Sequence, residues 1–216
     1  MRFMNSEKPT KKRSRGRPSR TPEQIEKSRQ LIVASAKELF LSEGYQGVTM
    51  RKIAAKAECL PATLYAIFPN KRAILYHLWD TVFIKLLEYL YSINENSNQE
   101  NRLNRLCNAF VDFWLDHPED YIAIFMIDDR IPNQKEDNFV LNFNVTQRFD
   151  IFLSAILEAQ KLGQIGSGDP EEIQNILLCC VQGITFNLIT IPEYPWGDTK
   201  LLKKQTIETV LKGIKA

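Results

Sequence analysis

Basic side chains at the start of two expected helices could bind phosphate. Thr49 can cap a short helix whose first turn contains Arg51 and Lys52. Lys71 and Arg72 occupy the first turn of a later helix. The helix dipole disfavours cations at these positions, whereas a bound phosphate accepts hydrogen bonds from the free backbone N–H groups and pairs with the basic side chains. The pattern therefore indicates phosphate binding rather than helix stabilisation.

Residue types that usually perform catalysis or hold metals lack the necessary spacing. His77 lies within an amphipathic segment and His117 precedes a proline, and neither has a His, Cys or carboxylate partner at ligand spacing. Asp128 and Asp129 are expected at a helix end or in a solvated loop. The sequence contains neither a glycine-rich phosphate loop nor a nucleophile elbow. We therefore expect a protein that is not an enzyme and uses no cofactor or metal.

Charge is unevenly distributed along the 216 residues. Residues 1–72 contain 16 Lys and Arg against 6 Asp and Glu, a net charge of +10, whereas residues 73–216 contain 12 against 20, a net charge of −8. This division favours a basic module that binds a polyanion, joined to an acidic body that does not. The four cysteines show no metal-binding spacing and the first residues lack the apolar core of a signal peptide, so we expect a cytoplasmic location.

Residues 1–22 are expected to form a flexible basic arm. The stretch 8–20 contains seven Lys and Arg and no large apolar side chain, so it cannot bury enough surface to fold alone. The sequence around Arg15 and Arg17 (RGRP) is similar to the short core with which AT-hook segments lay arginines along a narrow minor groove of DNA. The alternative is a solvated tail that adds only nonspecific affinity.

Beyond the arm, apolar residues recur with a period close to 3.6 and no segment has a sustained period of two. This predicts an all-α fold of about nine helices. One of these helices is expected to pass through Phe139 and Phe149 and to end at Gly163. We divide the remainder into a three-helix domain at residues 23–72 and a larger helical domain at residues 73–216.

Two short helices separated by a tight turn form the most informative stretch. A helix at residues 50–57 ends at a break at Glu58 and Cys59, and a second helix begins at Pro61 and ends near Phe68. Alanines at the expected contact suit a helix-turn-helix. In that motif the second helix enters the major groove of DNA, and the first crosses the phosphate backbone.

This stretch resembles the DNA-binding domain of the TetR family of bacterial transcription regulators. The resemblance covers about residues 25–80, with the family pattern T-x-R-x-I-A-x-x-A followed by T-L-Y-x-x-F-x-x-K-x-x-L. The matching residues are Thr49, Arg51, Ile53, Ala54, Ala57, Thr63, Leu64, Tyr65, Phe68, Lys71 and Ile74 or Leu75.

The resemblance implies which residues contact DNA. Thr63, Tyr65 and Lys71 would contact phosphates, and Arg51 would contact a base or a phosphate. Ile67 replaces a frequent aromatic residue or histidine, which favours apolar packing, for example on a thymine methyl group. The full set is Thr49, Arg51, Lys52, Thr63, Tyr65, Ile67 and Lys71, with Pro61, Ala62 and Ala66 nearest the base edges and Arg15 and Arg17 in the arm.

Two residues in the turn depart from the family pattern. Glu58 stands where the family usually has glycine, so the turn is either reshaped or strained by about 1 kcal/mol. Leu60 replaces the Ser or Thr that usually caps the second helix. These departures bear on the DNA sequence that is recognised more than on the fold.

The larger domain is rich in aromatic residues. The resemblance implies an effector pocket there, and an aromatic interior with few charges could leave a cavity for a hydrophobic or aromatic molecule. The predicted lining is Trp114, Phe125, Met126 and Phe149. The alternative is an ordinary core, because aromatic side chains at helical spacing usually pack on one another.

The last two expected helices are predicted to form a dimer seam. The first of them has a broad apolar face in which Gly183 permits close approach, and the second is capped by Asp198. Two such helices from each chain would make a four-helix seam. The first also holds the most apolar stretch, but Gln182 and Asn187 interrupt it, so we expect a buried helix rather than a membrane span.

Together these features predict a homodimeric regulator that binds double-stranded DNA at a palindromic operator. The simplest version is a repressor that leaves its operator when a small effector binds the body and the two DNA-binding domains become wrongly spaced. The alternative is a constitutive or architectural DNA-binding dimer whose body serves only for dimerisation.

Overall fold

The computed structural model describes residues 20–95, 101–129 and 150–214, and within these ranges the chain forms helices and no strands. This confirms the predicted all-α fold. The helices are α1 (Pro22–Glu43), α2 (Met50–Lys56), α3 (Pro61–Ile67), α4 (Lys71–Glu95), α5 (Arg102–Asp116), α6 (Pro118–Phe125), α9 (Asp150–Lys161), α10 (Pro170–Thr190) and α11 (Thr199–Gly213).

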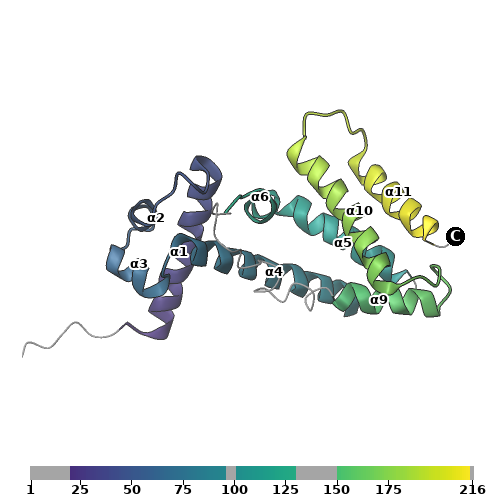
Figure 1. The fold of residues 1–216 in the computed structure, drawn as a ribbon, viewed down its shortest axis with the longest axis horizontal. Helices are drawn as coiled ribbons and strands as arrows, with labels where there is room; N and C mark the ends of the chain where they lie inside the picture. The colour runs from purple at the N-terminus through teal and green to yellow at the C-terminus, as the bar shows by residue number, and fades with distance from the viewer. Residues whose placement is uncertain (1–19, 96–100, 130–149, 215–216) are drawn as a thin grey trace, which may run out of the picture.

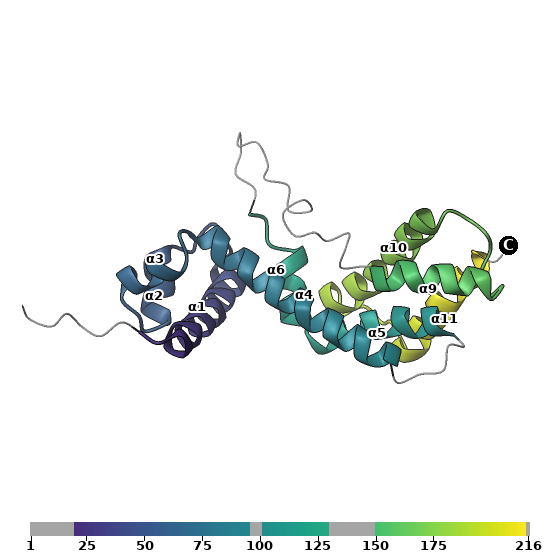
Figure 2. The same cartoon turned by 90° about the horizontal axis from the view of Figure 1, so that it is seen from below.

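Helices α1 to α3 form a small head at one end of an elongated molecule, as Figure 1 shows. Helices α5, α6 and α9 to α11 form a larger body, and α4 runs from the head along the body (Figures 1 and 2). One continuous cluster of buried apolar side chains extends through both parts, with Leu64 in the head, Leu75 and Leu86 on α4, and Phe110 in the body. The head is therefore attached to the body by packing as well as by the chain.

The first helix begins and ends where local chemistry predicts. Thr21 and Gln24 form a reciprocal capping box, in which each side-chain oxygen accepts a hydrogen bond from the other residue's backbone N–H, at 3.3 and 3.1 Å. Gly44 ends the helix with φ +73°, a conformation in which a side chain is unfavourable. Ala36 and Phe40 are buried on the inner face and fix α1 against the rest of the head.

The turn between α2 and α3 is strained rather than reshaped. Glu58 has φ +50°, in the left-handed region that favours glycine. The following helix starts at Pro61, whose fixed φ suits a first helical position, while Leu60 at the N-cap makes no capping hydrogen bond. The family glycine and the family cap are both missing, yet the two helices keep the helix-turn-helix arrangement.

Helix α5 is the centre of the body, because it packs against α4, α6, α9, α10 and α11. Buried rings meet edge to face here: the centroids of Phe110 and Trp114 lie 6.2 Å apart, and those of Trp114 and Tyr121 of α6 lie 5.6 Å apart. Phe110 also meets Phe152 of α9, at 6.1 Å. Aromatic packing of this kind gives a rigid core.

Within one chain, α10 is only partly buried, so the expectation of a buried helix is not met by the chain alone. Only 28% of its most apolar 18-residue stretch is buried, and Ile176 and Phe186 are 51% and 40% exposed. By length and composition alone, α10 is the one helix among the described residues that could cross a membrane, although Gln182 and Asn187 interrupt it. Its inner side chains pack on α5, α9 and α11. The opposite face of the helix is also apolar, but it is exposed.

The strain at Glu58 predicts that Glu58→Gly stabilises the protein. Removing the Cβ relieves the left-handed strain, and because the side chain is exposed little packing is lost, so the free energy of unfolding should rise by about 1 kcal/mol. Urea unfolding followed by circular dichroism measures the change. Glu58→Ala keeps the Cβ and is the matched control. Equal stability of the glycine and alanine variants would contradict the strain.

Candidate nucleic-acid interface

Helix α3 presents an outward face because its inner face is fixed in the head. Leu64 is fully buried and Phe68, directly after the helix, is 3% exposed. Opposite them, Pro61, Ala62 and Ala66 are exposed, as the family pattern predicts for residues near base edges. The rest of this face is formed by larger side chains. Tyr65 is 54% exposed, Thr63 is half-buried, and Ile67 is half-buried and packs against the core.

Helix α2 begins beside this face with the predicted cap. The Thr49 hydroxyl accepts a hydrogen bond from the backbone N–H of Lys52, at 3.3 Å. Arg51 is exposed and has no ion-pair partner within residues 20–95, 101–129 and 150–214. A free guanidinium in the first turn of a helix is well placed to pair with a phosphate.

Lys52 is already engaged in the free protein. Its ammonium group pairs with the Glu43 carboxylate and donates a hydrogen bond to the Gly47 carbonyl oxygen, at 3.1 Å. These contacts fasten the start of α2 to the end of α1. Any contact between Lys52 and a DNA phosphate therefore competes with Glu43, a carboxylate that sequence reasoning did not connect with this lysine.

Lys71 supports the head from inside. Its ammonium donates to the carbonyl oxygens of Tyr45 and Val48, at 2.6 and 3.2 Å, and lies 4.2 Å from the centre of the Tyr45 ring. Desolvation by burial lowers the pKa of Lys71 below its ordinary value. An ammonium group has three donors, so one remains for the predicted phosphate contact. The lysine also ties the start of α4 to the connection between α1 and α2.

The interpretation of Arg72 as a cation that awaits phosphate is wrong. Its Nε atom lies 2.7 Å from the Asp129 carboxylate, and both side chains are mostly buried. The carboxylate compensates the unfavourable position of a cation at a helix start. Asp129 is thus a paired residue between head and body rather than part of a solvated loop. The two residues are 57 positions apart, and no local pattern in the sequence connects them.

The predicted effector residues do not gather around one cavity within the described ranges. Trp114 is fully buried, and its indole Nε1 has no hydrogen-bond partner among these residues. Phe125 lies beside it, with ring centroids 5.5 Å apart, but is 39% exposed, and Met126 is 48% exposed. Phe149 lies outside the described residues, as do Arg15 and Arg17 of the predicted arm.

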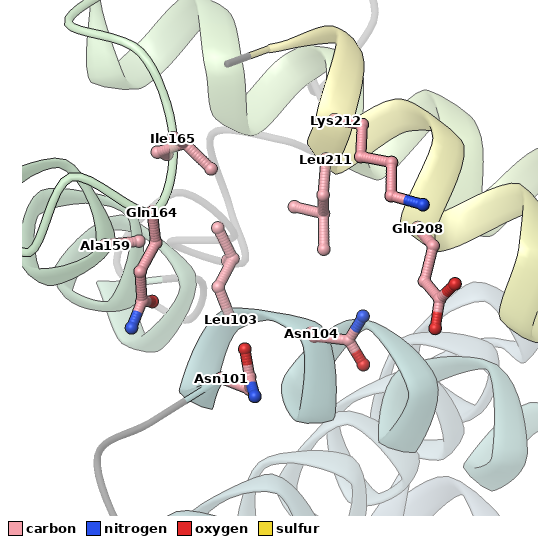
Figure 3. A pocket seen from close by; sticks show the side chains of 9 residues that line it. All are labelled: Asn101, Leu103, Asn104, Ala159, Gln164, Ile165, Glu208, Leu211 and Lys212. Atoms are coloured by element: carbon pink, nitrogen blue, oxygen red, sulfur yellow. The ribbon is translucent and has the colours of Figure 1, made fainter.

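Sequence reasoning missed a cavity of about 220 Å³ at the far end of the body. Figure 3 shows its apolar side chains facing one another across the space between α5, α11 and the segment after α9. It is smaller than the usual 300–1,000 Å³ of ligand pockets. Three separate parts of the chain contribute to it, so no motif signals it. The lining residues are Asn101, Leu103, Asn104, Ala159, Gln164, Ile165, Glu208, Leu211 and Lys212.

Comparison with known proteins assigns the head. Residues 32–78 match the family model described as bacterial regulatory proteins of the tetR family. This match covers most of α1, all of α2 and α3, and the start of α4. The chain is also 23% identical to the Transposon Tn10 TetC protein of Escherichia coli over 155 residues, which are 72% of this chain and 77% of that relative.

Solved structures share the fold of most of the chain. A bacterial regulatory protein in the tetR family from Rhodococcus RHA1 is similar with a TM-score of 0.67 and 18% identity, over 87% of this chain and 97% of that one. The SmeT–triclosan complex is similar with a TM-score of 0.66 and 20% identity, over 87% of this chain and 91% of that one. The helix-turn-helix of this chain thus matches the tetR family of bacterial regulatory proteins, and the chain has the fold of solved proteins of that family.

Proposed function

We propose that this protein is a cytoplasmic, homodimeric repressor that leaves a palindromic operator when a small hydrophobic or aromatic effector binds its body. The observation that carries the proposal is the exposed face of α3 beside Arg51, which is exposed and has no ion-pair partner among the described residues. The head that carries this face packs continuously onto an aromatic body. The domains follow the sequence-based division into an arm at 1–22, a DNA-binding domain at 23–72 and an effector and dimerisation domain at 73–216.

DNA docking uses the outward face of α3 and the start of α2. With α3 in the major groove, α2 crosses the phosphate backbone, which brings Thr49 and Arg51 close to phosphates. The exposed Tyr65 hydroxyl donates to a phosphate from α3. Lys52 and Lys71 contribute the donors that their contacts within the head leave free.

The exposed face of α10 supports dimerisation. Ile176 is half exposed and borders a groove of about 430 Å³ between the start of α10 and the end of α11. At the other end of α10, Phe186 and Ile191 are also exposed, as is Leu201 of α11. A second copy covers these side chains when two helices from each chain form a four-helix seam. Such a seam places the two heads on successive half-sites of a palindrome.

Helix α6 can pass a change in the body to the head. Lys37 of α1 pairs with Asp120, at 2.7 Å, and with Glu119, at 3.2 Å. On the other side, the Trp79 indole of α4 donates to the Ala123 carbonyl oxygen, at 2.8 Å. An effector that binds beside Trp114 would displace α6, because Tyr121 and Phe125 of α6 pack on the Trp114 ring.

The effector class follows from these surroundings. The Trp114 N–H has no partner in the part of the chain that the structure describes, so it offers one hydrogen-bond donor within an aromatic cluster, which suits an apolar molecule with a single acceptor. The SmeT structure with triclosan supports a small aromatic compound as the type of ligand. The effector can weaken operator binding at most by the ratio of its affinities for the two body conformations.

Arg51→Ala and Tyr65→Phe should weaken DNA binding without changing the melting temperature, since both side chains are exposed. We expect about a tenfold or greater loss for Arg51→Ala, in the range of a lost charged contact, and about a fivefold loss for Tyr65→Phe. Fluorescence anisotropy with an operator selected from a random DNA pool measures both. Lys85→Ala removes an exposed cation on α4 and is the control. Unchanged affinity in both variants would refute the docking face.

Ile176→Glu should convert the dimer into a monomer and lower operator affinity, because it places a charge in the apolar seam. Sedimentation equilibrium gives the mass of each species. Leu157→Glu, at a side chain that is 51% exposed on α9, is the matched control and should stay dimeric. A wild-type chain that is monomeric, or that is recovered with membranes, would contradict the proposed seam.

A thermal-shift screen of small apolar compounds should find a ligand that raises the melting temperature and also releases the operator. Asp129→Asn should retain that thermal shift but lose much of the release, because it weakens the link between Arg72 and the body. The matched control is Asp112→Asn, which weakens an ion pair to Lys203 within the body and should preserve release. Ligands that stabilise the wild type without affecting DNA binding would favour the alternative of a constitutive DNA-binding dimer.

A further inference from the structure

The surface that α3 presents contains an unexplained apolar side chain. Leu60, directly before the helix, is 64% exposed and is the most exposed large apolar side chain in the part of the chain that the structure describes. It makes no capping hydrogen bond, and it is absent from the apolar cluster that its neighbours Cys59 and Ile67 join. Neither local structure nor the core therefore accounts for a leucine at this position.

Three exposed residues of α3 beside Leu60 offer no side-chain hydrogen bonds to bases. Pro61, Ala62 and Ala66 are exposed and have no side-chain donor or acceptor, so the edges of base pairs can approach them closely. Ile67, which the sequence pattern made the candidate for a thymine contact, is half-buried against the core. Leu60 is thus the apolar side chain that extends freely from this surface.

The head that carries Leu60 is basic. Its described residues, 20–72, contain nine Lys and Arg against five Asp and Glu, a net charge of +4. This charge, together with the exposed Arg51, suits a polyanion better than an apolar protein surface. The occupant that fits both the charge and the apolar side chain is the major groove of DNA, where thymine is the base that offers a methyl group.

We propose that Leu60 reads thymine by packing on C5-methyl groups in the major groove. This inference rests on the proposed function, and it adds the kind of half-site that α3 selects. A cytosine at the same position lacks the methyl and presents an amino group that leucine cannot pair, so it is rejected. Recognition then depends on methyl groups at positions near Leu60 and on few side-chain hydrogen bonds to bases.

Deoxyuridine substitution in a selected operator tests this inference directly. Replacing one thymine with deoxyuridine removes only the methyl group, and the loss of one buried methyl corresponds to about a fourfold loss of affinity. Changing the same position in both half-sites should cost about fifteenfold. Fluorescence anisotropy at constant salt measures these ratios. Replacing that thymine with cytosine should weaken binding, and 5-methylcytosine should restore part of the affinity.

A variant comparison assigns the effect to Leu60. Leu60→Ser should bind the thymine operator more weakly than wild type and should lose nothing further on deoxyuridine substitution, because the contact is already absent. Leu157→Ser, at a similarly exposed leucine in the body, should behave as wild type.

The failures are distinguishable. Selection that enriches no sequence overturns the proposed function and this inference together. A selected operator that binds tightly overturns only the inference if its half-sites lack thymine, if deoxyuridine changes no affinity, or if wild type and Leu60→Ser are equally sensitive to it.

Discussion

The first turn of α4 connects the head to the body through two cations, one of which binds the head and the other the body. Lys71 reaches into the head and binds the carbonyl oxygens of Tyr45 and Val48, while Arg72 reaches toward the body and pairs with Asp129. Both contacts are shielded from water, where charged hydrogen bonds are strong. The orientation of the head relative to α4, and therefore the direction in which α3 faces, depends on this turn.

Apolar packing extends the same connection along α4. Leu75, Leu86 and Leu90 are fully buried, and they join the core of the head to the rings around α5. A continuous helix with a buried face transmits displacement without bending, because close-packed side chains cannot slide freely past one another. The head consequently has little freedom to adjust on its own, and in the proposed dimer the bodies determine the spacing of the two heads.

Local sequence signals predicted the fold well because its determinants are local. Caps such as Thr21 and Thr49 and the break at Gly44 lie within a few residues of the backbone groups that they affect. The ion-pair partners of the basic residues could not be predicted from the sequence, because Arg72 and Asp129 are far apart in the chain and meet only in the folded structure. The exposure of α10 was missed for a related reason, because composition gives the apolarity of a helix but not what covers it.

In the proposed dimer, the uncovered apolar face of α10 links the stability of each chain to how many copies are present. Apolar surface in water contributes nothing to folding, but it stabilises the native state once another chain covers it. In the proposed dimer two chains associate through this face, so operator occupancy rises more steeply with protein concentration than it would for a monomer. Dilute chains are also the first to unfold and to be degraded. Synthesis rate thus controls both the number of regulators and the lifetime of each one.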